Sequence, residues 1–399
     1  MKNTVKITDN LHYVGVNNHF LPKFENLFPL PEGVSFNSFI LLDEKTVLFD
    51  TVDASATTQF IDNVVSVLDG RPLDYLVIHH MEPDHGANVE TIIKMYPDVK
   101  IVGAKYTFEF LEQFFSDAYR DNYHLIKDGD ELVVGKNTLQ FHAAFLVHWP
   151  EVFVTYIKEQ KVLLSSDAFG SFGSIKGDPF SDVTPINLSE IRRYFANILA
   201  KFRRNVSTLL KKIEKLDIEI LLPLHGLLHR DKETIDMLIE KYHVWAKFDV
   251  EEPGVIIAFV SMYGNTANAA SLLATKLGLA GVKNIRLYDL NSVDFSYIIG
   301  DVYRFSNLVL LAPNYNVTLH LTAQHFLTEL EYHGFTKRNY SLIANSTWGG
   351  RALPFMEETF AKFRDVKLVG EPFTILTKLK EDTTTNLDNL AKEIVKSLE

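Results

Sequence analysis

Short apolar runs recur along the first half of the chain, and turn-forming or polar residues follow each of them. The runs at residues 76–78, 153–157, 162–166 and 218–224 are rich in aliphatic and β-branched side chains. Runs of this length, bounded by such residues, predict buried strands. The runs at 153–157 and 162–166 also lie close enough together to predict a hairpin.

The second half of the chain alternates apolar runs with longer amphipathic stretches. Residues 255–260 form a continuous apolar run, as expected for a parallel strand that is covered on both faces. Shorter runs follow at 308–311 and 342–344. Helices are predicted over 318–332, 352–363 and 384–398. This alternation of strands and helices predicts an α/β fold.

The clearest break in the chain is the Glu-Glu-Pro-Gly segment at 251–254. It follows a helical stretch at 232–247 and precedes the apolar run that begins at 255. A length of 399 residues favours two or three domains. We therefore predict a first domain over residues 1–250 and a second domain over residues 254–399.

Potential metal ligands lie just beyond the strand-like runs of the first domain. Four follow the run 76–78, in a loop where Pro83 and Gly86 are expected to turn the chain. The ends of strands can direct several side chains at one point, and mixed imidazole and carboxylate groups suit borderline or hard divalent metals. The sequence therefore predicts a two-metal site. Its candidate ligands are His80, Glu82, Asp84, His85, His148, Asp167 and His225.

At these residues the chain resembles the flavo-diiron proteins. The first four candidates fit the family pattern H-x-E-x-D-H, and the other three stand in H-W-P, D-A-F-G and H-G contexts. The stretch 33–39 is also similar to the family. The resemblance implies an α/β fold in which a metallo-β-lactamase-like αββα sandwich precedes a flavodoxin-like, doubly wound parallel sheet.

The resemblance also implies how the ligands divide between two irons. It places His80, Glu82 and His148 on one iron and Asp84, His85 and His225 on the other. Asp167 would bridge the two irons, and Glu82 and Asp167 would be the catalytic residues. The implied reaction is reduction of O2 to water, of NO to N2O, or of both.

Two other functions stay open for this pattern of residues. The first is a zinc hydrolase of the same fold. In such enzymes the position of Glu82 is typically a second histidine, whereas this chain has a carboxylate there. A carboxylate there favours iron because it adds a hard, negatively charged ligand. The second alternative is a flavin-binding electron carrier without catalysis, which the intact ligand set disfavours.

Three strand ends of the second domain predict a flavin site. The segment 261–266 combines hydroxyl groups with a glycine at the expected start of a helix, which suits a terminal phosphate. It lacks the lysine of an ATP-binding loop and the three glycines of a dinucleotide loop. It is similar to the flavodoxin phosphate loop, which implies FMN. The candidate flavin-binding residues are Ser261, Met262, Tyr263, Gly264, Asn265, Thr266, Pro313, Asn314, Tyr315, Asn316, Ser346, Thr347, Trp348, Gly349 and Gly350.

The chain departs from the family at some of these loops and beside the metals. Val317 stands where many members have glycine, and residues 345–347 stand where an aromatic residue is common. A histidine that many members have near the metals is absent, and the corresponding loop of this chain contains Glu25. We take Glu25 as an alternative proton donor, which favours O2 over NO as the main substrate.

Composition limits which partners and which cellular location we expect for the protein. The chain has no cysteine, which excludes a fused rubredoxin module, so electrons must come from a separate donor such as rubredoxin, a flavin reductase or a reduced deazaflavin. A net charge of -11 argues against nucleic-acid binding. The N-terminus lacks a signal-like apolar segment and no run could span a membrane, so we expect a cytoplasmic protein.

Three further features stay as expectations. The resemblance implies a head-to-tail homodimer or a dimer of dimers. Neighbouring residues of a strand point to opposite faces, so only one of His79 and His80 can face the metals. His229 is expected to support or pack beside the site rather than bind metal.

Overall fold

The computed structural model describes residues 3–399. The chain divides into two compact units, Met1–His243 and Val244–Glu399. The division falls inside helix α7 (Lys232–Ala246), a few residues before the break predicted at 251–254. The predicted domain limits, 1–250 and 254–399, stay predictions. Among residues 3–399, no helix is both long and apolar enough to cross a lipid bilayer.

One sheet of the first unit leads to the H-x-E-x-D-H segment. Its strand order is β1-β2-β7-β8-β9-β10-β11, and the pairs from β8 to β11 are parallel. The run predicted at 76–78 lies in β9 and just beyond it. The bounds are β1 Val5–Lys6, β2 Leu11–Tyr13, β7 Phe39–Leu42, β8 Thr46–Phe49, β9 Tyr75–Val77, β10 Lys100–Gly103 and β11 Tyr123–Leu125.

A second sheet delivers the remaining candidate ligands. Its order is β12-β13-β14-β15-β16, antiparallel except for the parallel pair β15-β16. The predicted hairpin is present, since Ile157 of β14 pairs with Val162 of β15. The bounds are β12 Glu131–Val133, β13 Thr138–Ala143, β14 Phe153–Ile157, β15 Val162–Leu164 and β16 Ile220–Leu222. Two short pairs lie outside these sheets: β3 (Val16–Asn18) with β6 (Val34–Phe36), and β4 (Lys23–Phe24) with β5 (Phe28–Pro29).

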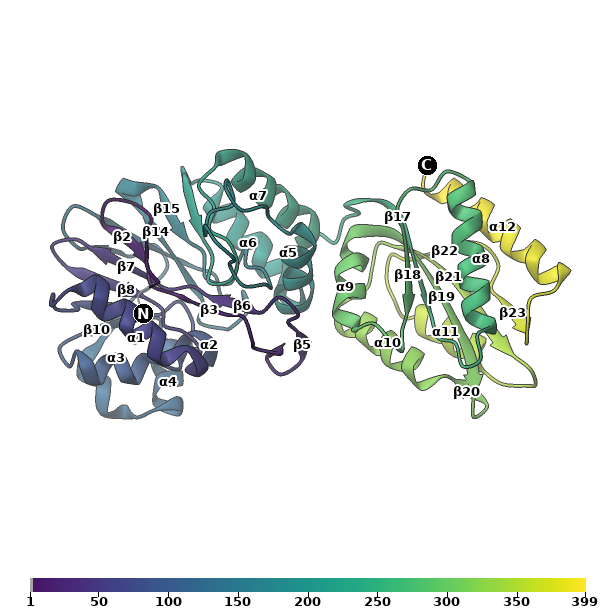
Figure 1. The fold of residues 1–399 in the computed structure, drawn as a ribbon, viewed down its shortest axis with the longest axis horizontal. Helices are drawn as coiled ribbons and strands as arrows, with labels where there is room; N and C mark the ends of the chain where they lie inside the picture. Colours follow the sequence, from purple (N-terminus) through teal and green to yellow (C-terminus); the bar gives the residue numbers. More distant parts are fainter. Residues whose placement is uncertain (1–2) are drawn as a thin grey trace. The chain divides into compact units, whose positions relative to one another are not determined.

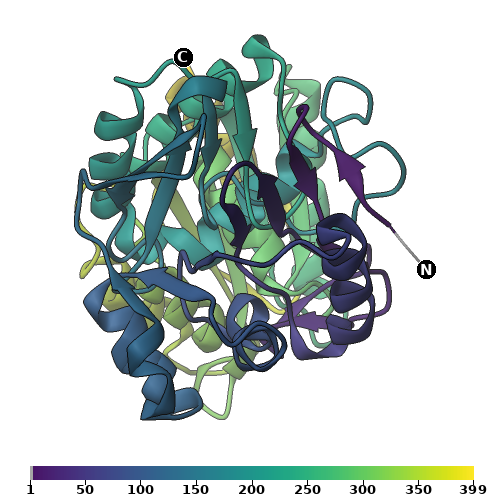
Figure 2. The same cartoon turned by 90° about the vertical axis from the view of Figure 1, so that its left-hand side faces the viewer.

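The two sheets of the first unit pack face to face. Leu41 and Phe49 of the first sheet share a buried cluster with Phe141 and Leu164 of the second. Burying each such side chain contributes about 2 kcal/mol. Helices α1, α3 and α4 lie on one side of the strands and α5, α6 and α7 on the other (Figures 1 and 2). This αββα arrangement confirms the predicted fold of the first half. The bounds are α1 Thr57–Leu68, α2 Pro83–Gly86, α3 Val89–Met95, α4 Lys105–Phe114, α5 Leu188–Tyr194 and α6 Arg203–Ile213.

The second unit is a parallel sheet covered by helices on both faces. The strand order is β18-β17-β19-β21-β22, with β23 also parallel to β21. Helices α8 and α12 lie on one side of the sheet, and α9 and α10 lie on the other (Figure 1). This is the predicted flavodoxin-like, doubly wound sheet. The strands are β17 Glu252–Phe259, β18 Ile285–Asp289, β19 Phe305–Tyr315, β20 Thr318–Leu319, β21 Asn339–Ser346, β22 Lys367–Leu368 and β23 Phe373–Leu376. The helices are α8 Asn265–Leu279, α9 Phe295–Arg304, α10 Leu321–Tyr332, α11 Ala352–Phe360 and α12 Glu381–Ser397.

The start of α10 differs from the helix predicted at 318–332. Thr318 and Leu319 form the strand β20, which pairs with the end of β19 as a tight hairpin. The helix begins only at Leu321, where the backbone N–H of Thr322 donates to Nδ1 of His320 at 3.2 Å. The amphipathic pattern continues through the hairpin, so periodicity alone could not place this boundary.

Candidate metal centre and flavin site

The structure brings all of the predicted metal ligands together in the first unit. His80 and Glu82 follow β9, and Asp84 and His85 lie on the single turn of α2. Pro83 occupies the first position of that turn, where its fixed φ and missing N–H favour the start of a helix. His148 lies between β13 and β14, Asp167 follows β15 and His225 follows β16.

Asp167 lies at the centre of this arrangement and is fully buried. Its Oδ2 atom lies 3.3 Å from Nε2 of His80 and 3.1 Å from Nε2 of His148. Its Oδ1 atom lies 3.7 Å from Nε2 of His85 and 3.8 Å from Nε2 of His225. The two oxygens of one carboxylate therefore face two different groups of imidazoles, as a bridging ligand would.

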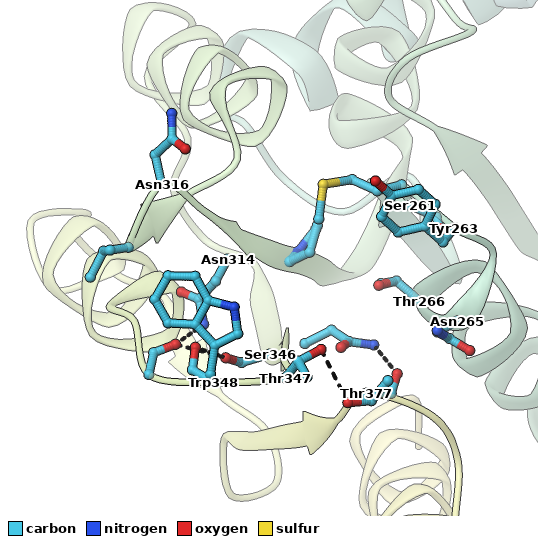
Figure 3. Close-up of a pocket in the computed structure, with 15 residues that line it drawn as sticks. Ser261, Tyr263, Asn265, Thr266, Asn314, Asn316, Ser346, Thr347, Trp348 and Thr377 are labelled. Atoms are coloured by element: carbon cyan, nitrogen blue, oxygen red, sulfur yellow. Dashed lines mark hydrogen bonds between the residues drawn. The ribbon is translucent and has the colours of Figure 1, made fainter.

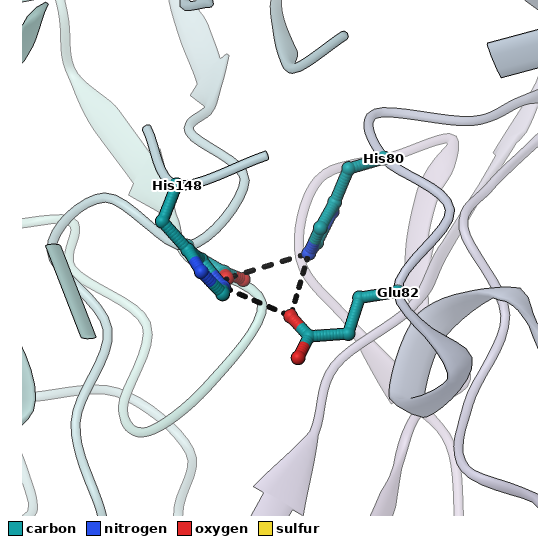
Figure 4. Close-up of side chains that lie close together, drawn as sticks. His80, Glu82 and His148 are labelled. Carbon is teal, nitrogen blue, oxygen red and sulfur yellow. Dashed lines mark hydrogen bonds and ion pairs between the residues drawn. The ribbon is translucent and has the colours of Figure 1, made fainter. Parts of the chain in front are cut away.

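Glu82 completes the first group. Its Oε2 atom lies 2.9 Å from Nε2 of His148 and 3.6 Å from Nε2 of His80 (Figure 4). Ligand atoms of His80, Glu82, His148 and Asp167 all lie within 4.8 Å of one another. This group combines two imidazoles with two carboxylates.

Asp84 holds the corresponding place in the second group. Its Oδ2 atom lies 3.2 Å from Nε2 of His85 and 3.2 Å from Nε2 of His225. The two Nε2 atoms are 2.9 Å apart. Two imidazole nitrogens that converge in this way are suited to a shared cation.

The surrounding residues orient the ligand imidazoles. Nδ1 of His225 lies 2.8 Å from the backbone carbonyl of Ser35, which accepts its N–H and leaves the Nε2 lone pair directed at Asp84 and Asp167. His79 points elsewhere: its Nδ1 bonds to Asp50 and its Nε2 lies 2.9 Å from Oγ1 of Thr155. His80, and not its neighbour, therefore belongs to the metal cluster.

The polar atoms of this cluster are suited to cations. Among residues 3–399, Nε2 of His80 and both carboxylate oxygens of Asp84 and Asp167 are buried without a hydrogen bond. Such atoms are costly unless a charge compensates them. Burial opposes ionisation of Asp167, yet His80 and His148 hold the pKa of this carboxyl well below its usual range. The donor set therefore fits two divalent cations that share Asp167.

A cavity of about 380 Å³ adjoins the cluster on the side of Glu82 and Asp84. Phe24, Phe36 and Glu25 contribute to its wall. Glu25 as a whole residue is exposed, but its carboxyl lies against Glu82. Loss of hydration, followed by repulsion from Glu82, raises the pKa of Glu25 to about 8. At neutral pH this residue can therefore hold a proton beside the cluster.

Tyr194 is a neighbour of the metal cluster that sequence reasoning missed. Its ring lies 5.5 Å from the ring of His225, and within residues 3–399 its buried hydroxyl makes no hydrogen bond. Burial and then the charge of Asp167 raise the pKa of this phenol well above its usual value. A tyrosine at the end of a helix resembles any core residue, so the sequence carried no signal for it.

His229 takes no part in the metal cluster. Its Nδ1 lies 2.9 Å from Oγ of Ser181, and its backbone pairs with that of Leu221. Burial lowers the pKa of His229 to about 4. The residue packs beside β16, which agrees with the role expected from the sequence.

The second unit contains a cavity of about 230 Å³ at the ends of β17, β19 and β21. Figure 3 shows Tyr263 and Trp348 on different sides of this space, and both side chains are largely exposed. We refer to it as the flavin cavity. It is lined by Ser261, Met262, Tyr263, Asn265, Thr266, Pro313, Asn314, Asn316, Val317, Asn345, Ser346, Thr347, Trp348, Gly349 and Thr377.

Three of the predicted flavin residues are not on the wall of this cavity. Gly264 precedes α8 with a φ of 89°, and Tyr315 packs against His320. Gly350 leaves room for Asn314, whose side chain would lie 2.4 Å from an added Cβ. Their roles in flavin binding stay predictions. Conversely, Thr377 lines the cavity from the loop after β23, which the sequence did not indicate.

The wall of the flavin cavity carries no formal charge, because its side chains are hydroxyl, amide, thioether, apolar or aromatic groups. Oγ of Ser261 accepts the backbone N–H of Gly264 at 3.1 Å, which shapes the turn into α8. Free N–H groups at the first turn of a helix attract anions. The turn is therefore suited to a phosphate group held by neutral donors.

Comparison with known proteins places the chain among redox enzymes. Residues 34–226 match the family described as "ODP family beta lactamase". A nitric oxide reductase of Moorella thermoacetica is 29% identical, covering 93% of each chain. A rubredoxin-oxygen oxidoreductase of Megalodesulfovibrio gigas is 30% identical over 78% of this chain and 77% of its own. The crystal structure of the flavodiiron protein from Giardia intestinalis, 22% identical, superposes with a TM-score of 0.90 over 100% of this chain and 98% of its own. The chain belongs to the flavo-diiron protein family.

Proposed function

We propose that this chain is an oxidoreductase that reduces O2 to water, NO to N2O, or both, at a non-haem diiron site supplied with electrons by FMN. The names of the relatives support the reaction. Membership of the flavo-diiron family supports the use of flavin and iron. The single observation that carries the diiron assignment is Asp167, whose two oxygens face two separate groups of ligands.

In this proposal His80, Glu82 and His148 hold one iron, and Asp84, His85 and His225 hold the other. When bound, the iron pair would bind and reduce a diatomic molecule, and the flavin would pass electrons singly or in pairs. The three carboxylates offset most of the charge of two divalent ions, which permits both to be held close together.

In this proposal, residues around the site supply a proton and limit the access of water. Glu25 lies at the cavity beside Glu82 and can hold a proton at neutral pH. The rings of Phe24 and Phe36 lie 5.2 Å and 5.9 Å from the ring of His225 and keep that side of the site apolar. Such aromatic rings beside the ligands limit the access of bulk water to the site.

FMN is the proposed flavin because the first loop of the cavity suits one terminal phosphate. Ser261 and Thr266 bring hydroxyl groups to the start of α8, and no cation accompanies them on the wall. A dinucleotide such as FAD would need room for a second phosphate and an adenosine, for which the sequence offers no fingerprint.

Metal and flavin analysis of purified protein tests these assignments. We expect protein produced with iron to contain two irons per chain and to show the absorption spectrum of an oxidised flavin. Extraction of the flavin should yield FMN. Protein that holds only zinc after iron reconstitution would favour the hydrolase, and protein that retains FAD would contradict the flavin assignment.

We propose O2 as the preferred substrate because proton delivery matters more for the oxygen reaction, and Glu25 can supply a proton. The test reduces the enzyme with one artificial donor and compares the steady-state consumption of O2 and NO. A markedly faster reaction with NO would overturn this preference and leave the diiron and flavin assignments intact.

The electron donor and the assembly are also proposals. The sequence has no cysteine that could bind an iron by thiolate, and we propose that a separate donor such as rubredoxin, a flavin reductase or a reduced deazaflavin reduces the flavin. We further propose a head-to-tail homodimer, alone or paired as a dimer of dimers, in which the flavin of one subunit serves the metals of its partner.

A further inference from the structure

Two β-branched residues of the second unit have backbone conformations that such residues rarely adopt. The φ angle is 65° at Val317 and 69° at Thr377. Within residues 3–399, every other non-glycine residue with positive φ lacks a branched Cβ. A branched Cβ makes the left-handed region costly. Both residues line the flavin cavity, although they come from different loops.

Val317 occupies a turn that normally takes glycine. Tyr315 and Thr318 pair across a two-residue hairpin turn formed by Asn316 and Val317, and both turn residues have positive φ. Turns of this kind favour asparagine at the first position and glycine at the second. Asn316 fits that preference, whereas Val317 does not. Val317 is also 53% exposed, so packing within the chain offsets little of the free-energy cost of its backbone conformation.

Thr377 acts through a neighbouring hydroxyl. Its Oγ1 donates to Oγ1 of Thr347 at 3.1 Å, and its backbone carbonyl accepts Nδ2 of Asn345 at 3.0 Å (Figure 3). A hydroxyl that accepts one hydrogen bond keeps its own hydrogen for another acceptor. Thr377 thus leaves the hydrogen of Thr347 available at the wall of the cavity.

We propose that Val317 and Thr377 are determinants of flavin binding, and that this role explains why both residues are kept in unfavourable backbone conformations. Val317 provides an apolar wall that the bound flavin covers, and Thr377 is a positioning residue that orients the hydroxyl of Thr347 toward the flavin. Strained residues persist where a binding site requires their side chains. The inference rests on the proposed flavin site and names the residues of this chain that shape it.

The first test compares Val317→Gly and Val317→Asn with the wild type, using the full chain freed of flavin. Both variants suit the left-handed turn and remove the apolar side chain. We expect a higher urea midpoint for the flavin-free variants, together with an FMN Kd about tenfold weaker because the covered apolar surface is lost. An unchanged or tighter FMN Kd would overturn the role of Val317.

Asp365→Gly is the matched control for the change in backbone strain. Asp365 has a φ of 55°, is exposed and lies outside the flavin cavity. Glycine at this position should leave the FMN Kd at its wild-type value. If Asp365→Gly weakens FMN binding as much as Val317→Gly does, glycine flexibility and not the lost apolar wall causes the effect. That result would overturn the inference.

The second test separates the hydroxyl of Thr377 from its shape. Thr377→Val keeps the branched Cβ and removes the hydroxyl, whereas Thr377→Ser keeps the hydroxyl. We expect a roughly fivefold weaker FMN Kd in the valine variant and near wild-type binding in the serine variant. Equal Kd values for the two variants would overturn the role of Thr377. Failure of the wild type to bind FMN would instead overturn the proposed cofactor and this inference together.

Discussion

Asp167 is the proposed bridge between the two groups of candidate metal ligands. Asp167→Ala would leave four imidazoles and two carboxylates around two cations that no shared anion holds together. We expect the variant to lose iron while FMN stays bound. Its rate of O2 or NO reduction should fall by about a hundredfold or more. Iron content by elemental analysis and flavin absorbance measure the two cofactors separately.

Asp98→Ala is the control for Asp167→Ala, because Asp98 is an exposed carboxylate away from the ligands. It should keep both cofactors and full activity. An Asp167→Ala protein that keeps its iron and its oxidase rate would contradict the bridging assignment.

His229 makes the stability of the first unit depend on pH. Burial lowers its pKa to about 4 in the folded chain, against about 6.5 for an unfolded histidine. The unfolded chain therefore binds this proton more readily. The stability associated with neutral His229 is fully present above pH ~6.5 and is lost as the pH falls toward 4, by about 3 kcal/mol in all.

His229→Gln should remove that part of the acid sensitivity. Urea unfolding between pH 7 and pH 4.5 is expected to show a smaller loss of stability for the variant than for the wild type. His19→Gln, at an exposed histidine, serves as the control and should follow the wild type. Parallel pH profiles for His229→Gln and the wild type would refute the prediction.

At the scale of elements, the clustering of the candidate metal ligands was predictable because their signal is local. The pattern from His80 to His85 directly follows a strand, and Asp167 and His225 each follow an apolar run. Parallel neighbours such as β15 and β16 end at one edge of their sheet, so residues beyond them converge. The spacing of a motif and the rule that strands end at one edge were enough to find the cluster.

The residues that sequence reasoning missed come from elements without such a signal. Thr377 follows β23, a short strand whose place beside β21 is decided by packing across the chain. Tyr194 reaches the metal cluster from α5, just before a π-helical turn at Phe195–Leu199 that no pattern indicated. Contacts between distant segments decide both positions, and local periodicity carries no information about them.

Arg338 holds the segment after α7 to the second unit. It is 3% exposed, and its guanidinium donates to the backbone carbonyls of Phe248, Asp249, Val302, Tyr303 and Lys337. Burial lowers its pKa to about 10, so it remains charged at neutral pH. Arg338→Met would leave these carbonyls without their donor and should cost about 3 kcal/mol or more of stability.

Lys337→Ala is a matched control one residue away. Lys337 pairs with Asp249 at 2.8 Å, but both side chains are about half exposed, so the pair contributes little. Urea unfolding followed by tryptophan fluorescence should show a large loss for Arg338→Met and almost none for Lys337→Ala. Similar midpoints for the two variants would contradict the assigned role of Arg338.

At the scale of the whole molecule, the candidate metal cluster and the flavin cavity lie in different units of one chain. Electron transfer therefore depends on which flavin lies beside which metal pair. In a head-to-tail dimer the partners come from different subunits, and two defective chains can complement each other. A chain with Asp167→Ala keeps its flavin site, whereas a chain with Ser261→Ala and Thr266→Ala keeps its metal ligands.

Each defective chain alone should be nearly inactive, since no dimer of either would hold both cofactors. Co-expression with two affinity tags yields mixed dimers, in which the intact flavin of one subunit meets the intact metals of the other. Random pairing makes half of the dimers mixed, each with one working site, so the total activity should reach about a quarter of the wild-type value. Electron transfer within a single chain would leave purified mixed dimers as inactive as their parents, and that result would overturn the head-to-tail arrangement.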